Sequence, residues 1–186
     1  MAVDFLSTWK RSALFIIWAC LTFFLFSGCA FRYVNQTSLD RAQIQEEKIQ
    51  KIAVLTFDNP PLNLQAGMHI SRLFELYLLR TGLYKIAERG EVERILRERG
   101  IMISPAGPVA SLQQLGDLLQ VDGIVLGSVS QYSRRDMAFT ARLVSVKSGL
   151  VLWSVSETGG NIFLPVSEVA RRAVLSAISD LQAGLR

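Results

Sequence analysis

The sequence predicts an α/β (α+β) fold, in which helices pack on a single mixed β-sheet. Two observations lead to this prediction. Short β-rich runs and amphipathic helical segments follow one another in the order β-α-β-α-α-β-β-β-α, which is typical of a mixed sheet with helices on it. The chain of 186 residues is long enough for one domain with a substantial core and too short for two comfortable ones.

The first half of the domain is predicted to alternate strands and helices. A buried strand at residues 52–57 ends at an Asn-Pro-Pro breaker, and a short strand follows at 84–87. A second helix covers 88–100, and its alternating Arg and Glu residues suit a solvated face. The first helix lies between the two strands, ends at Thr81-Gly82 and shows the i, i+3, i+4, i+7, i+8 spacing of one apolar face, at Ile70, Leu73, Phe74, Tyr77 and Leu78.

The second half is predicted to supply most of the sheet. After a loop with two prolines, a third helix covers residues 111–119 and a buried strand covers 121–132. A hairpin at 137–158 turns at Lys147-Ser148-Gly149, and a closing amphipathic helix spans 165–181. In the second strand of the hairpin, alternation places three apolar residues on one face, at Val151, Trp153 and Val155.

Residues 29–50 are predicted to form a lipid-anchored tether ahead of the domain at 51–186. The stretch is polar and has no strong periodicity. As a flexible coil it would span about 25 Å, and fully stretched about 70 Å. Packing against a neighbouring subunit is the alternative for this segment.

Residues 1–28 are predicted to be a lipoprotein signal peptide. Lys10 and Arg11 precede an apolar run that ends at Phe26, and this order is typical of a secretory signal. The run is short for a membrane span, which needs about 20 apolar residues. An uncleaved membrane anchor is the alternative, and it would also place the domain outside the cytoplasm.

The end of the apolar run resembles a bacterial lipobox, the sequence that signal peptidase II recognises, at Leu25, Phe26, Ser27 and Gly28 before Cys29. Phe26 departs from the pattern, because leucine is usual there. The resemblance implies that Cys29 carries diacylglycerol and palmitate and is the first residue of the mature protein. Ala30 is not the aspartate that retains such lipoproteins at the inner membrane, so we expect the periplasmic face of the outer membrane.

The side chains of the domain argue against an enzyme. His69 is the single histidine, and both cysteines lie before residue 30, so no histidine pair, disulfide framework or cysteine metal site is available. The sequence has no glycine-rich phosphate-binding motif. Asp58, Asp117 and Asp122 lie near the ends of elements, where aspartate commonly caps or turns the chain. We therefore predict no catalytic residue, no metal, no small-molecule substrate and no cofactor beyond the lipid on Cys29.

The pair Arg134-Arg135 is predicted to mark an exposed turn between two strands and is the candidate contact turn. Aromatic residues lie nearby on the strands, but a periplasmic location excludes nucleic acid as the partner. The net charge of +4 falls to +3 once residues 1–28 are removed. This charge is too small to indicate anionic partners, so we expect envelope proteins instead.

Four blocks of the sequence resemble the curli assembly/transport lipoproteins, the CsgG family. They are KIAVLTFDN from Lys51, GLYKIAERGEVERILRERG ending at Gly100, VDGIVLGSVSQY ending at Tyr132, and LVSVKSGLVLWSV ending at Val155. The resemblance implies a periplasmic domain like CsgG and the N-terminal domain of TolB. It also implies a role in assembly or transport at the envelope and, by analogy with the family's secretion channels, a homo-oligomeric ring.

The sequence departs from the channel-forming members of the family. Their subunits each insert two β-hairpins into the outer membrane, and a spanning strand needs about 9–11 residues. Only five residues lie between the strand ending near Tyr132 and the strand starting near Ala138, and only six between Thr158 and Pro165. We therefore expect the fold without its membrane hairpins.

Two related kinds of lipoprotein are alternatives for the function. Activators of peptidoglycan synthases of the LpoB type have a similar small domain, but they carry long, often proline-rich tethers, and residues 30–50 contain no proline. Flagellar outer-membrane lipoproteins are the other alternative. The sequence favours a non-catalytic outer-membrane lipoprotein that acts through protein–protein contacts.

Overall fold

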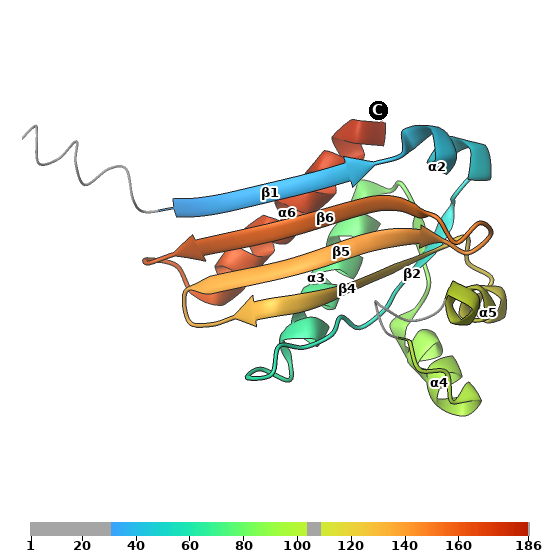
Figure 1. Ribbon diagram of the computed structural model, residues 1–186, viewed down its shortest axis with the longest axis horizontal. Coiled ribbons are helices and arrows are strands. Elements are labelled where there is room, and N and C mark those ends of the chain that lie inside the picture. The colour runs from blue at the N-terminus through green and yellow to red at the C-terminus, as the bar shows by residue number, and fades with distance from the viewer. Residues whose placement is uncertain (1–30, 104–108, 186) are drawn as a thin grey trace, which may run out of the picture.

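Residues 31–103 and 109–185 are described by the computed structural model, in which one six-stranded sheet has the order β1-β6-β5-β4-β2-β3 (Figure 1). Strand β2 runs parallel to β3 and β4, and the other neighbours are antiparallel. The elements are β1 (Phe31–Leu39), α2 (Arg41–Glu47), β2 (Lys51–Val54), α3 (Ala66–Thr81), β3 (Lys85–Ile86), α4 (Arg89–Arg99), α5 (Val109–Leu119), β4 (Gly123–Tyr132), β5 (Asp136–Ser145), β6 (Val151–Asn161) and α6 (Val166–Leu185).

The predicted fold class is confirmed. From β2 onward the elements follow the predicted order, and they form one mixed sheet with helices on it. The strand connections are short, as expected of a domain without membrane hairpins: residues 133–135 join β4 to β5, and 162–165 join β6 to α6. Among the described residues, none of the helices has the length and apolar character to span a bilayer.

The prediction of a tether over residues 29–50 is wrong from Phe31 onward. Strand β1 pairs with β6 along its whole length, from Phe31 opposite Asn161 to Leu39 opposite Trp153. Helix α2 follows at once, and its N-cap Asp40 accepts a hydrogen bond from the Gln43 N–H. The sequence lacks a strand signal here because β1 is an edge strand with mostly polar residues, and its stability comes from backbone pairing with β6.

The helices divide between the two faces of the sheet. Helices α3 and α6 lie together along one face, whereas α4 and α5 lie at the other face near β2 and the start of β4 (Figure 1). Consecutive residues of β2 therefore enter different cores, with Ile52 in the first and Ala53 in the second. This double coverage explains why β2 is a continuous apolar run instead of an alternating one.

An aromatic cluster fills the larger core, between the sheet and α3. Phe74 of α3 lies 5.2 Å from Phe57, 5.5 Å from Phe139 and 6.2 Å from Trp153, measured between ring centroids. All four side chains are almost completely buried. The residues come from α3, β5, β6 and the segment after β2, so this cluster joins distant parts of the chain.

The predicted ends of α3 and α4 agree with the structure, whereas α6 continues to Leu185, beyond the predicted end at 181, and one predicted alternation is wrong. Gly82 and Gly100 end α3 and α4 with φ of 67° and 61°, the left-handed conformation that glycine adopts at low cost. The prediction that Val151 shares a face with Trp153 is wrong. The register between β5 and β6 shifts at Leu143/Val144, so Leu152 and Trp153 are both buried and Val151 is 48% exposed.

We predict that Phe74→Ala destabilises the domain by about 3–5 kcal/mol, because it removes the ring at the centre of the aromatic cluster and leaves a cavity. Leu76→Ala is the matched control, since Leu76 is on the same helix but 42% exposed. Urea unfolding followed by circular dichroism measures both free energies of unfolding. An equal loss for the two variants would contradict this account of the core.

Candidate interaction surface

Half of one sheet face has no helix over it in the described structure. Helices α4 and α5 cover β2, the start of β4 and the end of β5, but not β1, β6 and the remainder of β4 and β5 (Figure 1). We call this area the open face. It is the side of the sheet opposite α3 and α6, and Figure 1 shows it turned toward the viewer.

Polar side chains cross the open face in rows from strand to strand. One row follows the register from Gln36 to Ser156, Thr140 and Ser128, and the Ser128 and Thr140 hydroxyls lie 3.1 Å apart. These rows line a shallow hollow of about 480 Å³. Hydroxyl and amide groups at the surface of a sheet can donate and accept hydrogen bonds, so this face suits a polar partner.

Arg142 lies on the open face, where it borders the core beneath α4 and α5. It is opposite Leu126 of β4 on one side and Ser154 of β6 on the other. The side chain is half-buried, and its Nε–H is inaccessible and has no hydrogen-bond partner among the described residues. A buried unpaired donor lowers stability by about 1–3 kcal/mol, so a guanidinium in this position is suited to a carboxylate supplied by a partner.

The outer edge of β1 is a second feature of the same region. Its pairing with β6 runs from residue 31 to residue 39 without a register shift, and the strand contains no proline or lysine. Edge strands of monomers usually carry such residues or bulges, which block pairing with another chain. On the α6 side, Asn35 donates to Asp180, so the edge is held firmly in place.

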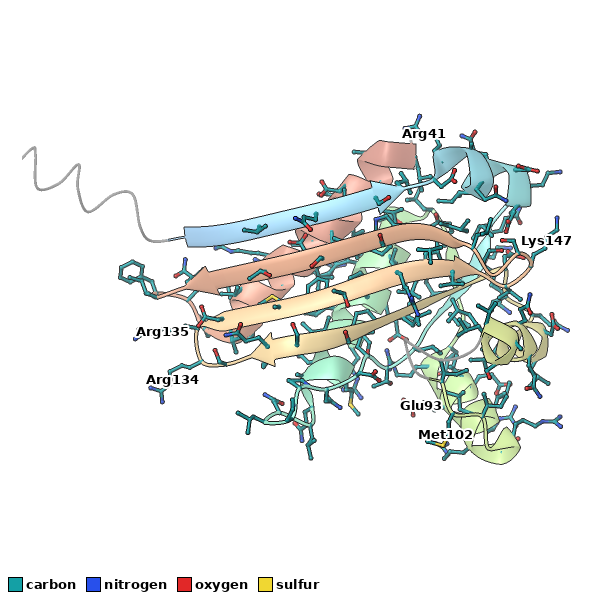
Figure 2. All side chains as sticks on the ribbon, viewed as in Figure 1. Arg41, Glu93, Met102, Arg134, Arg135 and Lys147 are labelled. Carbon is teal, nitrogen blue, oxygen red and sulfur yellow. The ribbon has the colours of Figure 1, made fainter. Side chains whose placement is uncertain are left out.

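The structure places the predicted contact turn where the sequence puts it, between β4 and β5. Arg134 and Arg135 are exposed and project away from the sheet at one end of the molecule (Figure 2). The Ser133 N–H donates to the Asp136 carbonyl at 2.8 Å and closes the turn. The role of Arg134 and Arg135 in contacts stays a prediction. The predicted lipobox residues lie outside the described part of the chain; they are Leu25, Phe26, Ser27 and Gly28, with Cys29.

The polar cluster around Arg89 has internal partners. Arg89 donates to Glu75 at 3.0 Å, to Thr56 at 2.9 Å and to Ser71 at 3.2 Å, and burial raises the pKa of Glu75. Burial, with the charge of Arg72, lowers the pKa of His69. Within residues 31–103 and 109–185, no group of three or more His, Cys, Asp or Glu residues could hold a metal ion.

Sequence reasoning did not find the open face or Arg142. The signal was present in the alternation of β5, where Thr140 and Arg142 are polar while Phe139, Ala141 and Leu143 are apolar. The same alternation in β6 places Ser154 and Ser156 opposite to Trp153 and Val155. However, alternation alone shows only that one face of the strands is more polar than the other. It does not show whether a helix covers that polar face or leaves it open to a partner.

Comparison with known proteins supports the fold and finds a similar family. Residues 48–138 match the family model described as curli production assembly/transport component CsgG. This part of the chain is therefore similar to the CsgG family. No curated protein matched the chain in a sequence search.

Solved structures similar to this domain show the same fold at low sequence identity. The PelC dodecamer from Paraburkholderia phytofirmans has a TM-score of 0.59 and 18% identity, and the match covers 81% of this chain and 98% of that chain. Lipoprotein GNA1162 from Neisseria meningitidis has a TM-score of 0.54 and 18% identity, over 73% and 99%. LpoB of E. coli has a TM-score of 0.50 and 11% identity, over 65% of each chain.

We predict that Arg142→Met changes the free energy of unfolding by less than about 1 kcal/mol, because it removes a partly buried charge that has no partner. Arg89→Met, the matched control, should lower it by about 2–3 kcal/mol, since Glu75 then loses its ion pair in a half-buried site. Urea unfolding measures the free energy of unfolding of both variants. A large loss for Arg142→Met would show that Arg142 stabilises the fold.

Proposed function

We propose that this protein is a lipid-anchored, non-catalytic accessory protein of the outer membrane that assembles with copies of itself through the open face and the β1 edge. The observation that carries the proposal is Arg142 on the uncovered sheet face, whose buried Nε–H has no hydrogen-bond partner among the described residues. Such a charge has a cost in the isolated domain, and a carboxylate from a second subunit would offset it.

Self-association is supported by the edge beside this face. An unprotected strand of nine residues offers backbone N–H and C=O groups to another chain. The similar PelC structure is a dodecamer, which is consistent with assembly of this fold into large oligomers. The match of residues 48–138 to the curli production assembly/transport component CsgG supports a role in assembly or transport at the envelope.

The anchor in this proposal is Cys29, with diacylglycerol and palmitate and an outer-membrane location on the periplasmic face. Because β1 begins at Phe31, the chain between Cys29 and the domain spans at most about 7 Å. Such a short connection holds the domain beside the membrane. It therefore disfavours the alternative of an LpoB-like activator, which must reach a peptidoglycan synthase at the inner membrane.

We predict that Cys29→Ala abolishes palmitate labelling and leaves the precursor uncleaved, because the thiol that receives the diacylglyceryl group is lost. Labelling of cells with radioactive palmitate, followed by immunoprecipitation, measures this. Cys20→Ala is the control and should label as the wild type does. Unchanged labelling of Cys29→Ala would rule out the lipid anchor at this residue.

We also predict that the mature protein in detergent is an oligomer and that Arg142→Glu converts it to monomers, since the reversed charge repels the carboxylate that Arg142 meets in the neighbour. Light scattering after size-exclusion chromatography measures the mass. Arg97→Glu is the matched control, because the Arg97 side chain is 71% exposed on α4, away from the open face.

Two outcomes of that experiment would contradict the proposal. A monomeric wild type would exclude self-assembly, and pull-down from solubilised envelopes would then identify the partner. Recovery of a peptidoglycan synthase would favour the LpoB-like alternative, and recovery of flagellar components would favour the flagellar one. An oligomer that tolerates Arg142→Glu would place the interface elsewhere on the domain.

A further inference from the structure

One end of the sheet brings together the start of β1, the β6–α6 loop and the β4–β5 turn. Phe31 pairs with Asn161, and the Asn161 N–H donates to the Arg135 carbonyl at 3.0 Å. Neighbouring strands lie about 4.8 Å apart, so these three backbone positions fall within about 10 Å of one another. Figures 1 and 2 show the same gathering at the left of the view, with Arg134 and Arg135 labelled.

This end of the molecule exposes apolar side chains. Ile162 is 55% exposed and Phe163 is 76% exposed, although both are large hydrophobic residues. The loop that presents them is ordered, because the Asn161 side-chain oxygen accepts hydrogen bonds from the Phe163 N–H at 2.7 Å and the Leu164 N–H at 2.9 Å. The two residues are thus held outward by the fold.

The charge beside these apolar residues is positive. Arg134 and Arg135 are both exposed, and the adjacent acidic residue is Asp136, so the turn keeps a net positive charge. Exposed aromatic and aliphatic side chains next to basic ones are the combination found where proteins rest on an anionic lipid surface. We call Ile162, Phe163, Arg134 and Arg135 the anchor end.

We propose that the anchor end rests directly on the lipid bilayer, with Ile162 and Phe163 among the lipids and Arg134 and Arg135 at the phosphate groups. This inference rests on the proposed lipid at Cys29. Only Ala30 separates Cys29 from Phe31, so the acyl chains start within about 7 Å of the strand that borders Asn161. Few orientations of the domain keep this end away from the membrane.

The same contact fixes the orientation of the other surfaces. Because β1, β5 and β6 all reach the anchor end, the strands run away from the membrane, and the open face and the β1 edge stand beside it. Copies anchored in this way would meet side by side within the plane of the membrane. The lipid contact therefore restricts the self-assembly proposed above to the plane of the membrane, with the strands of every copy running away from the bilayer.

The test uses the mature lipoprotein, purified in detergent and reconstituted into phosphatidylethanolamine–phosphatidylglycerol vesicles with brominated acyl chains. Phe163→Trp places an indole in the loop, and bromine should quench its added emission. Val151→Trp is the matched control, because Val151 is 48% exposed at the opposite end of the same strand. The native Trp153 is buried and supplies a constant background.

We expect quenching of the indole at 163 and none at 151, and Arg134→Gln with Arg135→Gln should lower the quenching at 163. Equal quenching at the two positions, or none at 163, would overturn the membrane contact. The intact mass of the same sample reports the lipid on Cys29. A lipidated protein without quenching overturns this inference alone, whereas a sample that lacks the lipid overturns the proposed anchor as well.

Discussion

The unequal covering of one β-sheet determines most of what this molecule can do. Helices α3 and α6 cover one face, and α4 and α5 cover only the part of the other face near β2 and the start of β4. The remaining area, which includes Arg142, is open to solvent. The larger core holds the aromatic cluster around Phe74 and supplies the stability, so the open face is free to be polar.

Strand β1 links the fold to the segment that contains Cys29. It adds a sixth strand by pairing with β6, and its first residue lies beside the loop of Ile162 and Phe163. The strand therefore combines three properties: it is an edge open to another chain, a border of the open face, and the continuation of the segment that carries Cys29. A flexible tether would have separated these properties in space, whereas a paired strand fixes them relative to one another.

The domain resembles PelC, GNA1162 and LpoB in fold at identities of 18% or less, so the shared feature is the architecture and not a set of side chains. Functional differences within such a fold come from its surfaces. In this chain two such surfaces are the hydroxyl rows beside Arg142 and the exposed apolar residues of the anchor end.

The sequence by itself determined the element order from β2 onward, the helix ends at Gly82 and Gly100, and the exposed turn at Arg134-Arg135, because periodicity, glycine and turn residues act locally. Tertiary structure alone decided that residues 31–39 form a strand, that Val151 faces away from Trp153, and that the Arg142 Nε–H has no hydrogen-bond partner within the described part of the chain. These outcomes depend on pairing and covering by segments distant in sequence, which local patterns do not encode.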